Sequence, residues 1–437
     1  MGVSINTANR PIPNADDYSV VPPGYKRTEV GLIPVDWDVK TLNELGTFMK
    51  GKGIKRDDVT DDGFACIRYG EIYTRYNDYV YSFASRIPES VAQTAQPLKA
   101  GDLLFAGSGE TAEEIGKCVA YLGEEEAYAG GDIVILRPVG QNSLYLGHLL
   151  NHAVVAEQKA RYGQGDAVVH ISARNLAIIR LPLPPTTYEQ GAIAEVLSDM
   201  DGLIAALEKL IAKKQAIKQA TMQQLLTGKT RLPGFTDTWN DTTIGAVADI
   251  RNGSTPSTQV PHYWNGSIPW CTPTDITGTR GKYLEHTARN ITEAGLASCA
   301  ASLLPPGTLL LCSRATIGEL KIARTHVCTN QGFKSLVCHG GTSHEFLYYL
   351  IQTLKPQLIE RAIGSTFLEI GKRDLAAIPL TIPLANEQSA IASVLSDMDA
   401  EIEALEQRRD KTQELKQGMM QQLLTGRVRL VNGEATA

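Results

Sequence analysis

The stretch AIAEVLSDMDGLIAALEKLIAKKQAIKQATMQQLLTG, residues 192–228, recurs as AIASVLSDMDAEIEALEQRRDKTQELKQGMMQQLLTG at residues 390–426. The two copies keep one register, since Asp199 and Asp397 are 198 positions apart, as are Met222 and Met420. The chain is therefore an internal duplication, and each half ends in a long predicted helix.

Apolar residues in both copies recur every three or four positions, the spacing that places side chains on one face of an α-helix. A helix of roughly 36 residues is on the order of 54 Å long. An apolar face is unstable in water, and the second copy provides a partner of the same kind. We predict that the two helices pair as an antiparallel coiled coil, because the residues between them must return the chain. The alternative is pairing between two chains, or docking on a different protein. The predicted packing residues are Ile193, Val196, Met200, Leu203, Leu207, Leu210, Ile217, Ile391, Val394, Met398, Leu405, Leu415 and Met419.

The duplication extends beyond the helices over nearly the whole chain; Gly165, for example, matches Gly364. Short apolar runs broken by Gly, Pro and Asn indicate strands in both halves. Short helices are expected at residues 144–159 and 343–354. The predicted fold is α+β, with two similar strand-rich globular domains separated by two long paired helices and related by a pseudo-twofold axis. The predicted segments are an N-terminal extension 1–30, a first domain 31–186, a helical spacer 187–231, a second domain 232–385, a second spacer 386–430 and a tail 431–437.

Composition bounds the class of protein. The chain is 43% hydrophobic and 21% charged, which is ordinary for a soluble globular protein. Its net charge of −6 argues against a simple basic DNA-coating protein. The seven cysteines include no CxxC pair, so neither a disulfide framework nor a zinc ribbon is indicated. The N-terminal residues lack an apolar core of signal-peptide length, and no stretch approaches the ~20 apolar residues that span a bilayer. We expect a cytoplasmic protein.

The sequence motifs of common enzymes are missing. The GKT at residues 228–230 has the ending of a phosphate-binding loop, but Gln223 stands where the first glycine is required. No [DNS]PP[YFW] string of an amino-methyltransferase is present. His148 and His152 lie four positions apart on an expected helix without a nearby acid or a third ligand, so no metal site is predicted. We expect a non-catalytic chain that binds no cofactor itself.

Several strings in the second half resemble one known family, the specificity (S) subunits of type I restriction-modification systems. They are NGSTPS at 252–257, IPWCTPTDI at 268–276, GTLLLCSRATIGELKIA at 307–323, TNQGFKSLVC at 329–338 and GSTFLEIGKRDLAAIPLTIPLANEQ at 364–388. The first half is similar more loosely, through GKGI, IRYGEI, GDLLFAGSGETAEEIGK and GQGDAVVHISARNL. The resemblance covers nearly the entire chain, and the repeated order of the strings is more specific than any one of them.

The resemblance implies two target-recognition domains, each reading one half of a split double-stranded DNA target, with helices that set the gap between the halves. It implies two methyltransferase (modification) subunits that carry S-adenosylmethionine, and ATP- and Mg-dependent restriction subunits in the full complex. The helix faces and their MQQLLTG ends are the expected seats of the methyltransferases. Lengthening both helices by four residues, about 6 Å, is predicted to shift the preferred gap by one or two base pairs. Because the reading loops of the two halves differ, we expect two unlike half-sequences.

Base edges and phosphates are contacted mainly by Arg, Lys, Asn, Gln, Ser and Thr on loops and strand ends. Three places in each half concentrate such residues and are the candidate DNA contacts. The first comprises Lys50, Lys52, Lys55 and Arg56, with Arg251, Asn252, Ser254 and Thr255 in the second half. Next come Arg68, Tyr69, Tyr73, Arg75 and Tyr76, with Thr272, Thr274, Thr279, Arg280 and Lys282. The third comprises Ser108 and Thr111, with Ser313, Arg314 and Thr316.

Structural roles compete with these assignments. The three tyrosines are spaced as a packing face, Arg314 could form a structural ion pair, and a structural role is expected for Asp275. For the chain as a whole, two other functions stay open. One is a specificity chain of another restriction class that works with a fused nuclease-methyltransferase. The other is a scaffold that pairs two proteins across a coiled coil without touching nucleic acid.

Overall fold

The computed structural model describes residues 21–165, 167–364 and 368–430. It separates into two compact units, each described by itself below. Unit 1 comprises the residues up to Ala206 together with those from Asp410 onward, and unit 2 comprises Leu207–Arg409. The two longest helices, α7 (Thr187–Leu225) and α14 (Ala385–Leu423), contribute residues to both units.

A five-stranded sheet in the order β4-β13-β9-β11-β6 forms the centre of unit 1. The strands of a second, four-stranded sheet, β7-β5-β12-β8, lie between those of the first along the chain. The two sheets share the apolar cluster that contains Ala65, Leu104 and Ile135. The strands of the two sheets are β4 (Gly46–Lys50), β5 (Phe64–Ile67), β6 (Tyr79–Val80), β7 (Ser85–Ile87), β8 (Gln96–Pro97), β9 (Leu103–Ala106), β11 (Cys118–Tyr121), β12 (Ala127–Ala129) and β13 (Ile133–Pro138).

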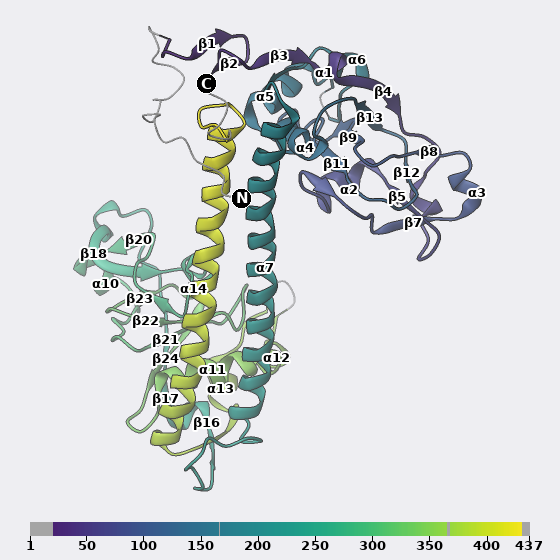
Figure 1. Ribbon diagram of the computed structural model, residues 1–437. Helices are drawn as coiled ribbons and strands as arrows, with labels where there is room; N and C mark the ends of the chain where they lie inside the picture. The colour runs from purple at the N-terminus through teal and green to yellow at the C-terminus, as the bar shows by residue number, and fades with distance from the viewer. Residues whose placement is uncertain (1–20, 166, 365–367, 431–437) are drawn as a thin grey trace. The chain divides into compact units, whose positions relative to one another are not determined.

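The remaining elements of unit 1 form two-stranded pairs and short helices (Figure 1). The pairs are β1 (Tyr25–Thr28) with β2 (Gly31–Pro34), β3 (Asp38–Thr41) with β15 (Arg180–Leu183), and β10 (Ser108–Gly109) with β14 (Val169–His170). The helices are α1 (Leu42–Leu45), α2 (Tyr69–Thr74), α3 (Glu89–Ala92), α4 (Ser143–Asn151), α5 (Ala153–Tyr162) and α6 (Ala173–Ala177), with a 3-10 turn at Arg56–Asp58.

Unit 2 repeats this topology. Its five-stranded sheet has the order β17-β24-β21-β22-β19, its smaller sheet is β20-β18-β23, and β16 pairs with β25. The strands are β16 (Asn240–Thr243), β17 (Ala248–Asn252), β18 (Trp264–Cys271), β19 (Tyr283–Leu284), β20 (Arg289–Ile291), β21 (Leu309–Cys312), β22 (Leu320–Ala323), β23 (Cys328–Thr329), β24 (Phe333–Cys338) and β25 (Pro379–Ile382). The helices are α8 (Ile244–Val247), α9 (Pro273–Gly278), α10 (Glu293–Ala297), α11 (His344–Thr353), α12 (Lys355–Glu360) and α13 (Lys372–Ala376), with a 3-10 turn at Pro261–Tyr263.

Strand register confirms that the duplication is structural. In unit 1, Ile133 of β13 pairs with Ala106 of β9, and in unit 2 the matched strands pair Phe333 with Cys312. A one-residue slip would turn every side chain of a strand to the opposite face. Equal registers therefore place matched residues of the two units on matched faces, so positions can be compared between the units by strand register.

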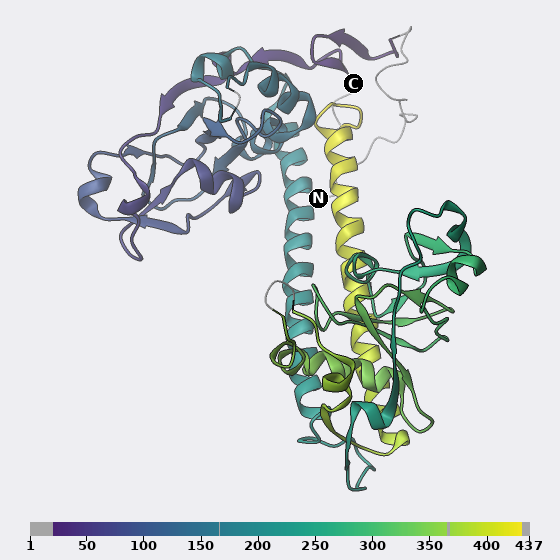
Figure 2. The same ribbon diagram turned by 180° about the vertical axis from the view of Figure 1, so that it is seen from behind.

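Within each unit, the two long helices pack antiparallel. In unit 1, Lys416 of α14 lies 2.7 Å from Asp201 of α7. In unit 2, Lys218 of α7 pairs with Asp399 of α14, where the views of Figures 1 and 2 agree that the two helical segments run side by side. Gln215 of α7 also bonds to Glu406 of α14 in unit 2, so the residue number falls along α7 as it rises along α14. In unit 1, Glu189 of α7 pairs with Arg429, just beyond the end of α14, which gives the same antiparallel direction. The predicted antiparallel pairing is confirmed.

The buried apolar face between the two long helices, called the seam below, includes only some of the predicted packing residues. Ile193, Leu207 and Ile391 are buried, and Val196, Met200, Val394, Met398, Leu405 and Met419 are half-buried. The prediction was wrong for four members, since Leu203, Leu210, Ile217 and Leu415 are 38%, 38%, 43% and 53% exposed. A helix contacts one neighbour over only part of its circumference, and each helix carries more apolar positions than that face holds. The seam instead uses residues that the prediction omitted, namely Leu197, Ile211, Leu395 and Ile402.

Each MQQLLTG motif closes its helix and belongs to a hydrophobic core. Met222, Leu225 and Leu226 lie in the main core of unit 2, and Met420, Leu423 and Leu424 lie in that of unit 1. The final glycines, Gly228 and Gly426, adopt φ values of 68° and 70°, the left-handed conformation that ends helices. The apolar side chains of the motif are therefore buried within the chain, and the prediction that they seat a partner protein does not fit their placement.

Two smaller corrections concern the helix expected at residues 144–159. It is two helices, α4 and α5, and His152 caps the junction between them rather than lying on the helix of His148. His148 does have a nearby acid, because its Nδ1 atom lies 2.9 Å from Oδ2 of Asp78. Across the described parts of the chain, no helix is both long and apolar enough to cross a membrane.

Candidate nucleic-acid interface

In unit 2, four backbone hydrogen bonds tie together segments that are far apart in the sequence. Ser254 N donates to Thr329 O at 2.9 Å, and Asn330 N donates to Cys271 O at 3.0 Å. Ser313 N donates to Gly332 O at 2.8 Å, and Ile370 N donates to Ser313 O at 3.0 Å. Five segments therefore converge: the loop after β17, the end of β18, the turn before β24, the loop after β21 and the extended segment that leads to α13. We call this set of bonds the loop frame.

Unit 1 contains the same loop frame at the matched positions. Lys52 N donates to Ala129 O at 3.1 Å and Gly130 N donates to Ile67 O at 2.9 Å. Gly107 N donates to Asp132 O at 2.7 Å and Ile171 N donates to Gly107 O at 2.9 Å. Each bond differs from its counterpart in unit 2 by at most 0.2 Å, as the two sets of distances show. The chain thus builds one backbone arrangement twice and attaches different side chains to it.

The first predicted group lies on the loop frame or beside it. Lys50, Lys52, Lys55 and Arg56 of unit 1 are exposed, as are Arg251 and Asn252 of unit 2, whereas Ser254 and Thr255 are half-buried. Arg251 is paired with Asp249 at 2.9 Å. A hollow of about 470 Å³ in unit 1 is lined by Lys50, Gly107, Asp132, Gln164 and His170. The hollow places the exposed Lys50 and several polar side chains around a concave part of the frame.

The second predicted group in unit 1 follows β5, but its members form a short helix, α2, rather than a loop. The hydroxyl group of Tyr73 is buried, and Tyr76 packs edge-on against Phe83, so both tyrosines serve the core. Arg68 and Arg75 lie 3.5 and 3.7 Å from the buried carboxylate of Glu71. Only Tyr69 and Arg75 of this group are exposed. The prediction that Tyr73 and Tyr76 contact DNA does not fit their placement, because the helix turns them inward.

The matching group in unit 2 is divided between two environments. Thr272 and Thr274 lie at the start of α9, where Asp275 accepts hydrogen bonds from the backbone and the hydroxyl group of Thr272 at 2.7 and 2.6 Å. Thr279 donates its hydroxyl hydrogen to Asp275 O at 2.7 Å. The structural role predicted for Asp275 is therefore confirmed. Thr274 is exposed at the beginning of this helix.

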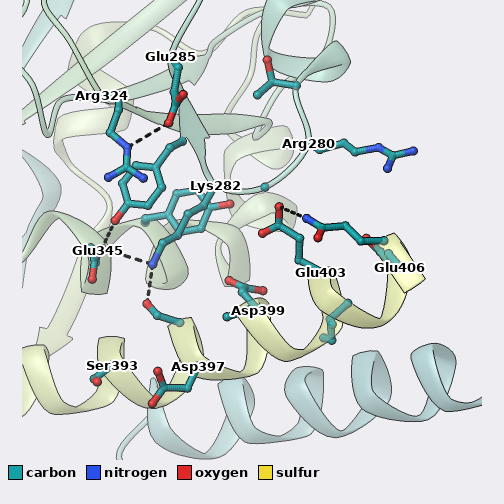
Figure 3. Close-up of a pocket in the computed structure, with 18 of the residues that line it drawn as sticks. Arg280, Lys282, Glu285, Arg324, Glu345, Ser393, Asp397, Asp399, Glu403 and Glu406 are labelled. Atoms are coloured by element: carbon teal, nitrogen blue, oxygen red, sulfur yellow. Dashed lines mark hydrogen bonds and ion pairs between the residues drawn. The ribbon is translucent and has the colours of Figure 1, made fainter. Parts of the chain in front are cut away.

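Lys282 does not lie on the loop frame. It lies in a pocket of unit 2 against α14, where its ammonium group bonds to Ser396 and lies 3.3 Å from Glu345 (Figure 3). Arg280, by contrast, extends away from this lysine. The DNA contact predicted for Lys282 does not fit this placement, because Lys282 joins the globular part of unit 2 to its long helix.

The third group includes two buried serines. Ser313 donates to Gly332 O at 3.1 Å and Ser108 is hydrogen-bonded to His170 Nδ1 at 2.9 Å. Both side chains stabilise the loop frame, so the contacts predicted for these two hydroxyl groups do not fit the structure. Arg314 and Thr111 are exposed and Thr316 is half-buried. Among the described residues Arg314 forms no ion pair, which does not support the structural ion pair considered for it.

Sequence reasoning missed the turn that begins β13 and β24. Gln331 in unit 2 is exposed and accepts a hydrogen bond from the hydroxyl group of Thr255. His170, exposed in unit 1, was missed as well. The string TNQG at 329–332 was a signal for this turn, but small and uncharged residues draw less attention than lysine and arginine in a search for DNA contacts.

A buried charge network lies where the globular part of unit 1 meets its helices. Asp78 is buried and accepts hydrogen bonds from His148 Nδ1 and Asn151 Nδ2, each at 2.9 Å, and it lies 3.2 Å from Lys416 Nζ. Burial raises the pKa of Asp78, but the hydrogen bonds and charges of its partners outweigh that effect and lower the pKa to about 2. The ligand atoms of Asp78, His148 and Asp201 lie within 4.8 Å of one another. The Lys416 ammonium group bonds to both carboxylates and supplies the positive charge that a metal ion would bring.

The matched positions of unit 2 form a second network with different chemistry. Strand register places Lys282 at the position of Asp78, and Tyr349 on α11 at the position of His148. Tyr349 donates to Asp399 at 2.6 Å, and Asp399 also pairs with Lys218. The Lys–Asp pair between the helices is kept in both units, whereas the globular part contributes an acid in one unit and a base in the other.

The fold and the loop frame define a protein with two similar strand-rich domains, each presenting its own polar side chains from one common backbone arrangement. The family described as type I restriction modification DNA specificity domain matches residues 34–219 and again residues 236–417. These two matches cover most of the chain, and the chain belongs to this family. The expectation drawn from the sequence resemblance is confirmed.

Individual relatives agree with this assignment. The type I restriction enzyme MjaIX specificity subunit of Methanocaldococcus jannaschii is 40% identical over 167 residues, which is 38% of this chain and 39% of the relative. The putative MjaX specificity subunit of the same organism is 26% identical over 432 residues, covering 93% of this chain and 97% of the relative. This chain thus spans less than half of the first relative and nearly all of the second.

Two solved structures share the fold. The S subunit of a type I restriction-modification system from M. genitalium aligns with a TM-score of 0.57 and 13% identity, covering 89% of this chain and 96% of that one. A chain from a study of complex assembly and conformational transition of the type I R-M system aligns with a TM-score of 0.58 and 19% identity, covering 90% and 99%. The structural similarity covers both units rather than one of them alone.

Proposed function

We propose that this chain is the non-catalytic, sequence-reading subunit of a type I restriction-modification complex, with each domain contacting one half of a bipartite, asymmetric DNA target. The observation that carries the proposal is the loop frame, which recurs with nearly equal hydrogen-bond lengths in both units but bears different side chains. A common frame gives both domains the same way of approaching a duplex. Different side chains on that frame give each domain its own base preference.

The charge distribution supports contact with DNA together with a partner. Lys50, Lys52, Lys55 and Arg56 form an exposed basic segment of unit 1, and Arg314 is exposed in unit 2. Phosphate contacts contribute much of the affinity for DNA, and a chain of net charge −6 offers few of them. We therefore propose that methyltransferase subunits supply further cationic surface. In this assignment those subunits bind S-adenosylmethionine, restriction subunits bind ATP with Mg, and the assembly works in the cytoplasm.

The long helices are proposed to set the spacing of the two half-sites and to seat the methyltransferases. Leu203, Leu210 and Ile217 recur at intervals of seven along α7, so they share one face of the helix, and each is exposed. Large apolar side chains at such a spacing are typical of a helix that receives another helix. This face, rather than the buried MQQLLTG ends, is the proposed docking surface of a methyltransferase.

Binding and footprinting test the proposal against the scaffold alternative. The full chain, assembled with methyltransferase subunits, is titrated with DNA fragments at several salt concentrations, and the bound fragment is then probed with a nuclease. We expect affinity to fall steeply with salt and two protected segments to flank an accessible gap. DNA affinity is compared between two matched variants, Lys52→Gln on the loop frame and Lys411→Gln on an exposed face of α14. Protein binding that persists without any protection of DNA would establish the scaffold.

The identity of the partner proteins distinguishes a type I system from the other restriction class, in which one polypeptide carries both nuclease and methyltransferase. Purification of the chain from its native cells is expected to recover separate methyltransferase and restriction polypeptides. Recovery of a single polypeptide with both nuclease and methyltransferase activities would assign the chain to the alternative class.

A further inference from the structure

The turn before β24 differs from its counterpart before β13 in the side chains that it presents. Strand register matches Asn330, Gln331 and Gly332 of unit 2 with Gly130, Gly131 and Asp132 of unit 1. The turns are held by the same loop-frame bonds in both units. The position occupied by an exposed glutamine in unit 2 therefore carries no side chain in unit 1.

Gln331 is held by a neighbouring hydroxyl group. Thr255, on the loop after β17, donates its hydroxyl hydrogen to Oε1 of Gln331, which leaves a second lone pair on that oxygen. Among the described residues, no partner is recorded for the amide nitrogen of Gln331. Because Thr255 restrains the amide plane, Gln331 presents one donor and one acceptor side by side in a fixed orientation. That pair matches the N7 acceptor and the N6 donor of adenine in the major groove.

Arg314 lies beside the same turn. A methyl group placed on Gly332 would come within 3.8 Å of Cγ of Arg314, so the arginine side chain runs along the turn. Glu369, which bridges to Arg314 through the backbone, directs its carboxylate to Lys334 at 2.9 Å. The guanidinium group of Arg314 is therefore not neutralised by that acid. Gln331 on the turn and Arg314 on the loop after β21 thus lie on adjacent segments of the loop frame, and both are side chains that can read base edges.

The matched positions of unit 1 have none of this chemistry. Gly131 replaces Gln331, Gly53 replaces Thr255, and Ser108, which is buried, replaces Arg314. His170 stands where unit 2 has Glu369, and it is exposed with Nδ1 bonded to Ser108. The frame is shared, but the glutamine–arginine pair belongs to unit 2 alone.

We propose that Gln331 and Arg314 are specificity-determining residues of unit 2, with Gln331 reading an adenine and Arg314 a guanine in the half-site bound by that domain. The proposal rests on the DNA-reading function proposed above and identifies two of the side chains that make the two half-sites unlike. Thr255 acts through Gln331 and is a positioning residue.

Selection from a DNA library tests this assignment. The full chain, assembled with methyltransferase subunits, selects from duplexes in which two random half-sites are separated by random spacers of several lengths. For Gln331→Gly we expect one base pair of one half-site to lose its adenine preference by roughly 5- to 150-fold, the discrimination of one bidentate contact. Arg314→Lys keeps the charge without the guanidinium fork, so it should lose guanine preference at another base pair of the same half while affinity is retained.

Three further variants distinguish an effect on base reading from a general effect on the fold. Thr255→Val should weaken the adenine preference less than Gln331→Gly does, because it only frees the amide to rotate. Gly131→Gln should add a preference to the other half-site, since no atom lies within 4 Å of a Cβ placed there. Gln93→Gly removes an exposed glutamine at the end of α3, outside the loop frame, and should leave the motif unchanged.

The outcomes are distinguishable. If the wild-type complex selects a split motif that Gln331→Gly and Arg314→Lys leave intact, the residue assignment is overturned while the DNA-reading function stands. If both variants alter the two half-sites equally, they act on the fold and the assignment is likewise overturned. If the wild-type complex selects no sequence, the proposed function itself fails. A thermal unfolding curve for each variant identifies any that do not fold, in which case Gln331→Glu, which keeps the size of the side chain, replaces Gln331→Gly.

Discussion

The Nζ atom of Lys416 lies 3.2 Å from Oδ2 of Asp78, although 338 positions separate the two residues in the sequence. Lys416 also bonds to Asp201 on the other long helix at 2.7 Å. One buried ammonium group thus joins the globular part of unit 1 to both of its helices. The junction matters for the proposed function, because any tilt there would displace the loop frame relative to the helices.

Removal of this ammonium group is predicted to destabilise unit 1 strongly. Lys416→Met removes the ammonium partner of the buried carboxylate of Asp78 and of the half-buried carboxylate of Asp201, and removal of one partner of a buried ion pair typically costs about 3–5 kcal/mol. Denaturant unfolding, followed by a probe in unit 1, measures the loss. Lys411→Met on an exposed position of the same helix is the control and should change stability by less than about 0.5 kcal/mol. Equal effects of the two substitutions would contradict a special role for Lys416.

Asp78 gives the stability of unit 1 an acid dependence. Burial opposes ionisation, but the bond from His148 and the charges around Asp78 lower its pKa to about 2, below the ordinary value of 3.8 for an aspartate. A carboxyl group whose pKa is depressed by folding stabilises the fold above pH 3.8, and that contribution disappears as pH falls toward 2. We expect a loss of about 2 kcal/mol over this interval. In Asp78→Asn the slope of unfolding free energy against pH should be smaller there, and parallel curves for the two proteins would refute the assignment.

Lys159 gives the stability of unit 1 a second pH dependence, of the same sign but at alkaline pH. Its ammonium group is fully buried, donates to Gly116 O and Leu150 O at 2.7 and 2.8 Å, and has a pKa lowered by burial to about 8. Between pH 8 and 10.5 the unfolded chain binds more protons than the folded one, so stability should rise with pH in that range.

The matching position of unit 2 suggests a variant of Lys159 in which stability no longer rises with pH. Leu358, also buried, lies 199 positions after Lys159, the offset that relates the bridges Gln164–His170 and Ile363–Glu369. Lys159→Leu should therefore be tolerated and should abolish the rise in unfolding free energy between pH 8 and 10.5. Lys99→Leu, at an exposed position, should retain the rise. A variant of Lys159 with the wild-type slope would show that another group is responsible.

Helix length is predicted to control the spacing of the half-sites. Four residues inserted into α7 after Ala206, and four into α14 after Arg409, add about 6 Å to each helix. The insertions lie nearly opposite each other in the antiparallel register that Lys416–Asp201 and Lys218–Asp399 define. We expect the preferred gap to widen by one or two base pairs, at ~3.4 Å each, without change in either half-sequence. A gap unchanged in the selected DNA would exclude the helices as the spacer.

The sequence predicted the large features because they depend on repeated, local patterns. The offset of 198 between the copies and the spacing of apolar residues were sufficient for two long helices and their antiparallel pairing. The seam was predicted less well. Apolar residues at Leu203, Leu210 and Ile217 follow the helical period, but only packing against the partner helix decides which of several apolar faces is buried.

The candidate interface was predicted in outline and not in detail. Strand ends and turns are visible in sequence, and the predicted loops around Lys50 in unit 1 and around Asn252 and Arg314 in unit 2 lie on segments that the loop frame joins within each unit. Their contact with DNA stays a prediction. Lys282 was misassigned because its neighbour Ser396, 114 positions away, is brought to it only by the fold. Gln331 was overlooked because its significance depends on the hydroxyl group of Thr255, 76 positions earlier.

Sequencing of methylated DNA tests directly whether each domain has its own base preference. The chain is expressed with methyltransferase subunits in cells that lack other DNA methylation, and every modified base of the genome is mapped with its surrounding sequence. We expect one recurrent motif made of two unlike half-sequences separated by a gap of constant length. Modification at one continuous sequence, at two identical half-sequences, or at no defined sequence would contradict the assignment of a separate base preference to each domain.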